Sequence, residues 1–254
     1  RRVLREAASR EHPLRVVLAL DELEVLSASS DVCKTLFSQL RALATESLIA
    51  YVVASQRPLA AYTTADNSHF FNIFASVQLG LLSAAECRAM IGGYLKETGL
   101  VLASEIVEHI LTLSGRHPFL LQVISYHAVE IQAVAGAALG ERDTDRLRRS
   151  VSNELEPHLA YYWTRLDDVE RYALTALVLI QQNASYHTQL RALANLCLIV
   201  EQDGRYDYFT PLLLEYIRRQ EVEGILQEGP LVLVEAFQNA LLDEEPLHLS
   251  PRQF

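Results

Sequence analysis

The sequence predicts a mixed α/β fold that is mainly helical. Two apolar runs, residues 15–20 and 48–54, have the length and composition of buried strands. Between them, apolar residues recur at three- and four-residue spacing, as they do on one face of a helix. Strand, helix and strand make a βαβ unit, whose strands run parallel with a right-handed connection. Helical patterns dominate after about residue 83, so we expect one parallel sheet followed by helices.

Composition excludes several classes of protein. The 254 residues carry a net charge of −10, which disfavours general binding to nucleic acid. The sequence holds no apolar run of the roughly 18–20 residues that a membrane helix needs. Its three cysteines, Cys33, Cys87 and Cys197, are far apart and lack a metal-binding spacing. They indicate core thiols in a reducing compartment, so we expect a cytoplasmic protein without membrane contact.

The first apolar run ends in two carboxylates, Asp21 and Glu22. We expect this run to be a strand buried on both faces, as in parallel sheets covered by helices. Acids just past the carboxyl end of such a strand lie where open α/β sheets bind their ligands. In a nucleotide hydrolase the first acid would bind Mg²⁺, and the second would orient or deprotonate the attacking water. The alternative is a strand that simply ends in a polar turn.

The second run ends in Ser55 and Arg57, which we expect to face the same crevice as the two acids. The planar guanidinium of arginine pairs well with phosphate oxygens and keeps its charge. The alternative is that Arg57 forms a salt bridge with one of the acids. Residues 76–79 alternate enough to predict one more short strand.

Two further motifs mark helix ends. Ser83 and Glu86 have the spacing of a capping box. Gly115 fits the position after a helix, and Pro118 fits the first turn of the next one, so backbone chemistry alone explains this loop. The functional alternative places His117 and Pro118 over a nucleotide, because the free amides at a helix start attract anions.

The last third predicts helices followed by a hairpin. Asp203 and Gly204 separate two strand-like pieces, which is a strong hairpin signal, and a last helix should run from residue 211 to about Arg219. This order suggests a winged helix. Residues 151–225 hold six arginines, no lysine and eleven acids, a net charge of −5, so protein packing is favoured over DNA contact.

Taken in this order, the motifs resemble the STAND branch of the P-loop ATPases, signal-transducing relatives of the AAA proteins. Residues 16–22 resemble the Walker B motif, residues 54–57 the first sensor, and residues 114–122 the glycine–proline lid motif, with Arg116 in place of a second glycine. The resemblance implies ATP and Mg²⁺ as cofactors. It also implies roles for seven residues: metal binding for Asp21, catalysis for Glu22, and nucleotide binding for Ser55, Arg57, Gly115, His117 and Pro118.

The resemblance also implies how the chain is divided. The fold would comprise the C-terminal half of a P-loop NTPase parallel sheet, a helical lid, a winged helix and a short β-rich tail. The corresponding domains would be the ATPase core (1–80), the helical lid (81–150), a regulatory winged helix (151–225) and the start of an OmpR/PhoB-type DNA-binding domain (226–254).

A phosphate-binding loop of the form Gly-x-x-x-x-Gly-Lys is missing, and the only lysines are Lys34 and Lys96. We expect that loop upstream of Arg1, and the DNA-recognition helix beyond Phe254. The chain would then be part of a nucleotide-dependent switch that regulates transcription, inactive alone, with self-association or a regulatory protein as further partners. One alternative is a degenerate, non-catalytic scaffold for protein–protein interaction. A free-standing DNA-binding regulator is disfavoured by the acidic balance.

Overall fold

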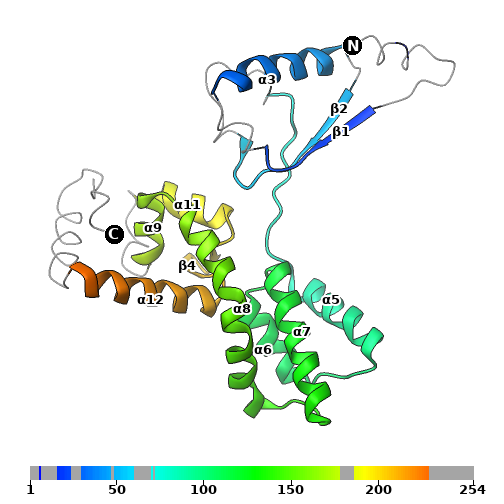
Figure 1. The fold of residues 1–254 in the computed structure, drawn as a ribbon, viewed down its shortest axis with the longest axis vertical. Helices are drawn as coiled ribbons and strands as arrows, with labels where there is room; N and C mark the ends of the chain where they lie inside the picture. The colour runs from blue at the N-terminus through cyan, green and yellow to red at the C-terminus, as the bar shows by residue number, and fades with distance from the viewer. Residues whose placement is uncertain are drawn as a thin grey trace. The chain divides into compact units, whose positions relative to one another are not determined.

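The computed structural model describes residues 6, 16–23, 30–46, 49–59, 70, 72–177 and 186–228. The chain divides into two compact units, residues 1–78 and 79–254, shown in Figure 1.

The first unit contains the predicted βαβ arrangement. Strand β1 (Val16–Leu20) is followed by helix α3 (Ser30–Thr45) and strand β2 (Ile49–Val53). The two strands pair in parallel, and Leu20 lies opposite Val53. The prediction of two parallel strands joined through a helix is therefore confirmed.

One face of this sheet carries the core of the first unit. Leu23, Phe37 and Phe70 are almost completely buried, and Leu20, Tyr51 and Val53 of the strands pack against them. Phe37 and Phe70 stack with their ring centroids 5.1 Å apart. The Tyr51 hydroxyl donates a hydrogen bond of 3.0 Å to the Leu40 carbonyl and so ties β2 to α3.

The other face of the sheet is apolar but exposed. Successive side chains of a strand point to opposite faces, so Val17 and Ala19 share this face with Ala50 and Val52. Val17 and Val52 are each 60% exposed. The prediction that the first strand is buried on both faces is therefore wrong for the described part of the chain, because α3 and the aromatic cluster cover only one side.

The predicted strand at residues 76–79 is also wrong. These residues have no regular secondary structure, and Val77 is 83% exposed. Their alternating pattern satisfies the sequence rule for a strand, but within the residues described no neighbouring strand pairs with them.

The second unit begins with three helices, α5 (Ala84–Thr98), α6 (Ser104–Ser114) and α7 (Pro118–Ala135). The predicted capping box is confirmed at the start of α5. The Glu86 amide donates to the Ser83 hydroxyl at 3.2 Å, and the Ser83 amide donates to the Glu86 carboxylate at 2.8 Å. This exchange satisfies two amides that a helix start leaves without a partner.

The described remainder of the second unit, residues 136–177 and 186–228, is mainly helical and contains one hairpin. After a short 3₁₀ turn, η2 (Glu141–Asp143), come helices α8 (Thr144–Thr164), α9 (Asp168–Thr175) and α11 (His187–Asn195). Strands β3 (Ile199–Gln202) and β4 (Arg205–Tyr208) pair antiparallel, which confirms the predicted hairpin. Helix α12 (Pro211–Glu228) extends beyond the predicted end at Arg219.

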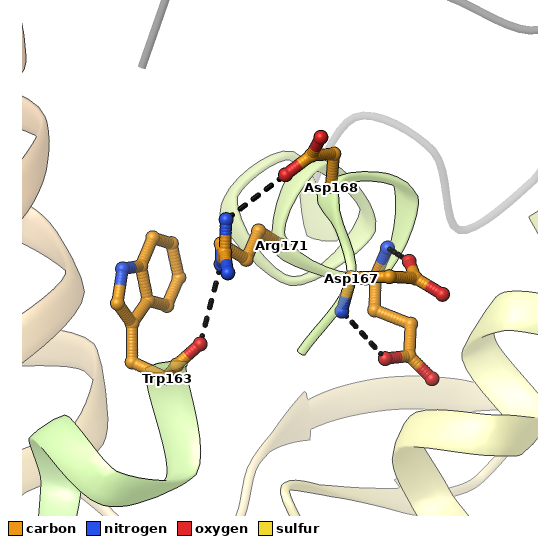
Figure 2. A network of polar contacts seen from close by, with 5 residues as sticks. Trp163, Asp167, Asp168 and Arg171 are labelled. Carbon is orange, nitrogen blue, oxygen red and sulfur yellow. Dashed lines mark hydrogen bonds and ion pairs between the residues drawn. The ribbon is translucent and has the colours of Figure 1, made fainter. Parts of the chain in front are cut away.

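Figure 2 shows how α8 passes into α9. Arg171 donates through Nε to the Trp163 carbonyl at 3.3 Å and pairs through Nη1 with Asp168 at 2.9 Å. Asp167 forms a second capping box with Glu170. Trp163 belongs to α8 and Arg171 to α9, so the hydrogen bond between them ties the two helices together at the turn.

One hydrophobic core runs through the described helices and the hairpin of the second unit. It includes fully buried residues from α6 to α12, such as Ile106, Leu120, Leu147, Leu174 and Leu213. The three leading helices and the hairpin-containing part therefore stabilise one another. Across the described parts of the chain, no helix combines the length and apolar character needed to cross a bilayer.

Candidate functional site

The carboxyl ends of β1 and β2 bring four predicted site residues to one edge of the sheet. The Ala54 amide donates to the Leu20 carbonyl at 2.9 Å, and the Leu23 amide donates to the Ala54 carbonyl at 3.2 Å. These two bonds bracket Asp21 and Glu22, so both acids lie beside the start of the segment that carries Ser55 and Arg57. We call residues 21–22 and 54–57 the carboxyl edge.

Both acids of the carboxyl edge are exposed, and the side chain of Asp21 hydrogen-bonds the backbone of Glu22. The Asp21 carboxylate accepts a hydrogen bond of 2.9 Å from the Glu22 amide. Glu22 has a backbone φ of 51°, in the left-handed region that side chains other than glycine seldom occupy. Strained backbone of this kind is concentrated at functional sites. The conformation is thus a second, independent reason to examine Glu22.

Ser55 organises the other half of the carboxyl edge. Its hydroxyl donates to the Arg57 carbonyl at 2.8 Å, which closes a tight turn directly after β2. The Arg57 side chain is half-buried. The turn keeps Arg57 close to the end of the strand, where the sequence places it.

The acids of the carboxyl edge fit the needs of a nucleotide-bound Mg²⁺ ion. Among the residues that the structure describes, no three His, Cys, Asp or Glu side chains lie close enough together to hold a metal by themselves. Mg²⁺ at a nucleotide needs only one or two carboxylates, because phosphates and water supply its other ligands. An exposed Asp21 meets that requirement.

The three remaining predicted site residues lie in the second unit, between α6 and α7. Gly115 ends α6 with a left-handed φ of 56°, and Pro118 is the first residue of α7. Both local predictions are confirmed. His117 immediately precedes α7 and makes no side-chain hydrogen bond to the helix amides.

His117 points into the second unit. Its Nε2 lies 3.3 Å from the Tyr162 hydroxyl, and its ring centroid lies 6.0 Å from those of Tyr162 and Phe209. Its Nδ1 is buried and has no hydrogen-bond partner among the described residues. Burial lowers the pKa of His117, so the ring is neutral near pH 7. Tyr162 and Phe209 were missed by the sequence analysis, since no local pattern links them to residue 117.

The parallel pairing of β1 with β2 brings Asp21, Glu22, Ser55 and Arg57 to one edge of the sheet, and comparison with known families shows the class of protein to which the chain belongs. Residues 4–178 match the family model of nSTAND2, described as Novel STAND NTPase 2. The chain therefore belongs to this family of STAND NTPases.

Comparison with a solved structure supports the fold. The Walker-type ATPase PABY2304 of Pyrococcus abyssi superposes with a TM-score of 0.55 and 15% sequence identity, over 80% of this chain and 63% of that chain. The RuvB Holliday junction branch migration motor of Thermotoga maritima has a TM-score of 0.47 and 14% identity, over 84% of this chain and 72% of that chain. A search of curated proteins found no match.

These comparisons support part of the sequence interpretation. The chain has a mixed α/β, mainly helical fold that resembles part of a P-loop ATPase, and it spans 63% of the Pyrococcus protein. Membership of an NTPase family implies nucleotide binding. Of the predicted β-rich tail, residues 226–254, the first three residues belong to helix α12, and residues 229–254 lie outside the part of the chain that the structure describes.

Proposed function

We propose that this chain belongs to a nucleotide-dependent signal-transduction ATPase, in which ATP and Mg²⁺ control a regulatory switch. The observation that carries the proposal is the carboxyl edge. Parallel pairing of β1 with β2 places Asp21, Glu22, Ser55 and Arg57 at one end of the sheet, and Glu22 has a left-handed backbone there. Open α/β sheets bind their ligands at this end.

Each side chain of the carboxyl edge has a proposed role. Asp21 would bind Mg²⁺, and Glu22 would orient or deprotonate the attacking water. Ser55 and Arg57 would contact the phosphates, with Arg57 on the terminal one. Bound Mg²⁺ would neutralise charge that develops on the phosphate oxygens.

The lid residues Gly115, His117 and Pro118 would contact the nucleotide in this proposal. The backbone amides of Phe119 and Leu120 in the first turn of α7 are one reason, because Pro118 has no N–H and the N-terminus of a helix attracts anions. The inward orientation of His117 makes backbone atoms of the loop better candidates than its imidazole.

A complete site needs a phosphate-binding loop, and the sequence contains no Gly-x-x-x-x-Gly-Lys. We propose that a longer protein supplies it from a segment upstream of Arg1, and that the 254 residues alone do not hydrolyse ATP. The division at residues 80, 150 and 225 is part of the same proposal. So is a transcriptional output through an OmpR/PhoB-type domain that starts near residue 226, in the last turn of α12.

The test is Glu22→Gln in the longer protein. Loss of the carboxylate should lower ATP turnover by about 10²–10⁴-fold, the usual contribution of a general base, while Mg²⁺–ATP remains bound. Turnover would be measured as phosphate release, and binding by calorimetry. Glu105→Gln, at an exposed acid in the first turn of α6, serves as the control and should leave both quantities unchanged.

Normal ATP turnover by the Glu22→Gln variant would contradict a catalytic role for Glu22.

A second candidate function, the non-catalytic scaffold, is favoured by one observation: His117 packs against Tyr162 and Phe209 inside the second unit. The scaffold predicts that the longer protein binds no Mg²⁺–ATP in the same calorimetric experiment.

A further inference from the structure

The loop between α6 and α7 is a meeting point of distant parts of the second unit. We call residues 114–117 the latch loop and residues 79–82, which precede α5, the strap. A Cβ atom at Gly115 would overlap the Phe209 carbonyl oxygen and lie 2.6 Å from the Phe209 carbonyl carbon. The backbone that leads from β4 to α12 therefore rests directly on Gly115.

Thr210 stabilises the contact between Gly115 and the Phe209 backbone. Its side chain is fully buried, and its hydroxyl donates to the Leu113 carbonyl at 2.6 Å. The same oxygen accepts from the Leu212 amide at 3.2 Å. A single hydroxyl thus satisfies a carbonyl in the last turn of α6 and an amide in the first turn of α12, which would otherwise be left without partners.

The strap is held from two sides by strained residues. The Leu82 amide donates to the Arg116 carbonyl at 3.0 Å, and Cys197 Sγ lies 4.0 Å from the Leu79 carbonyl oxygen. Arg116 and Cys197 have φ values of 61° and 58°, although neither is glycine. Backbone in this region persists only where surrounding contacts enforce it. In the described part of the second unit, the one other such residue is Asp203, in the hairpin turn.

His117 closes the remaining side of the latch loop. Its ring packs against Phe209 and also contacts Tyr162, near the end of α8. The loop therefore contacts α8 and the start of α12 and hydrogen-bonds the strap, through groups that are adjacent in sequence.

We propose that the latch loop is a conformational switch point with two arrangements. In the closed arrangement it holds the strap, the end of α8 and the start of α12 together. In the open arrangement the strap and the first turns of α12 are released in one step, because the strained backbone at Arg116 loses the contacts that enforce it when Phe209 and Thr210 leave. This inference needs no nucleotide and does not depend on the proposed ATPase activity.

Hydrogen exchange of the whole 254-residue chain tests the proposal. The key comparison is Gly115→Ala against Gly136→Ala. Both glycines end a helix with left-handed φ, 56° and 64°, but a Cβ at Gly136 meets no described atom within 4 Å. Gly136→Ala should speed exchange only at the end of α7. Gly115→Ala should speed it at least about tenfold in residues 79–83, 114–118 and 209–214 together.

A second variant tests the proposed switch if Gly115→Ala does not fold. Thr210→Val keeps the shape of the side chain and removes its hydroxyl. The proposal requires faster exchange of the Leu82 amide in this variant, although Thr210 is not its hydrogen-bond partner. Faster exchange confined to Leu212 and Leu213 would show a helix cap and no switch. Equal behaviour of Gly115→Ala and Gly136→Ala would also overturn the proposal.

Discussion

Glu22 has a backbone conformation that its side chain does not favour. A left-handed conformation costs a residue with a side chain about 1–2 kcal/mol, whereas glycine adopts it freely. A carboxylate at this position is therefore retained against a conformational cost. That is the pattern expected where a side chain serves function and not stability.

Replacing Glu22 by glycine should therefore stabilise the fold. Relief of the φ of 51° is partly offset by the greater freedom of glycine in the unfolded chain, which leaves a net gain of about 0.5–1 kcal/mol. Urea unfolding measures this gain. Asp203→Gly, in a hairpin turn with a φ of 52°, is the control and should gain less, because aspartate adopts left-handed backbone more readily than glutamate. A destabilised Glu22→Gly variant would mean that the carboxylate makes contacts that outweigh the strain.

His117 gives the second unit a pH dependence with a defined sign. Burial lowers its pKa below the ordinary value of 6.5, so below that pH the unfolded chain binds a proton more readily than the folded one. Stability should therefore be complete above pH 6.5 and fall as the pH drops from there towards the lowered folded pKa. His109 should change the stability with pH in the same direction, because burial and the nearby Arg148 lower its pKa.

The measurement is urea unfolding at pH 7.5, 6.5 and 5.5 for the unmodified chain and for His117→Gln. The unmodified chain should lose more stability between pH 7.5 and 5.5 than the variant does. His109→Gln, measured in parallel, separates the contribution of the second histidine. Identical losses in the unmodified chain and His117→Gln would show that residue 117 does not carry this effect.

At the scale of elements, the exposed face of the β1–β2 sheet is the least expected feature. Parallel sheets are normally covered on both sides. Val17, Ala19, Ala50 and Val52 form this apolar face, and we propose that a further segment of the longer protein packs on it.

Val52→Lys tests this coverage. In the 254-residue chain Val52 is 60% exposed, so the change should alter the free energy of unfolding by less than about 0.5 kcal/mol. In the longer protein the same lysine would be buried without a partner and should cost at least about 2 kcal/mol. Val134→Lys, at an α7 position that is 82% exposed, should be silent in both proteins. A silent Val52→Lys in the longer protein would contradict the proposed cover.

The elements also show what the sequence can and cannot predict. Strand ends, the Ser83 capping box, the Gly115 helix end and the Asp203 hairpin depend on neighbouring residues, so local patterns identified them. The carboxyl edge was predictable too, because parallel strands end on the same side of a sheet. The contact of Gly115 with Phe209 was not, since it joins residues that no spacing rule connects. The false strand at residues 76–79 has the same cause: alternation is local, but a strand needs a partner.

At the scale of the whole molecule, this member of the nSTAND2 family has its carboxyl edge and its latch loop in different units. The carboxyl edge belongs entirely to the first unit, and the latch loop to the second. Residues 72–83, which lead from one to the other, contain no helix or strand and continue directly into the strap. Communication along the chain between the two units must pass through this segment.

The shared core of the second unit also limits how the protein can be recombined with its relatives. A chimera joined between residues 150 and 151 would divide α8 and pair core faces that come from different parents. A chimera joined near residue 78 would transfer that core intact, along with both partners of the Gly115–Phe209 contact. Recombination within the family would, on this basis, leave crossover points before the strap or after α12, and few between them.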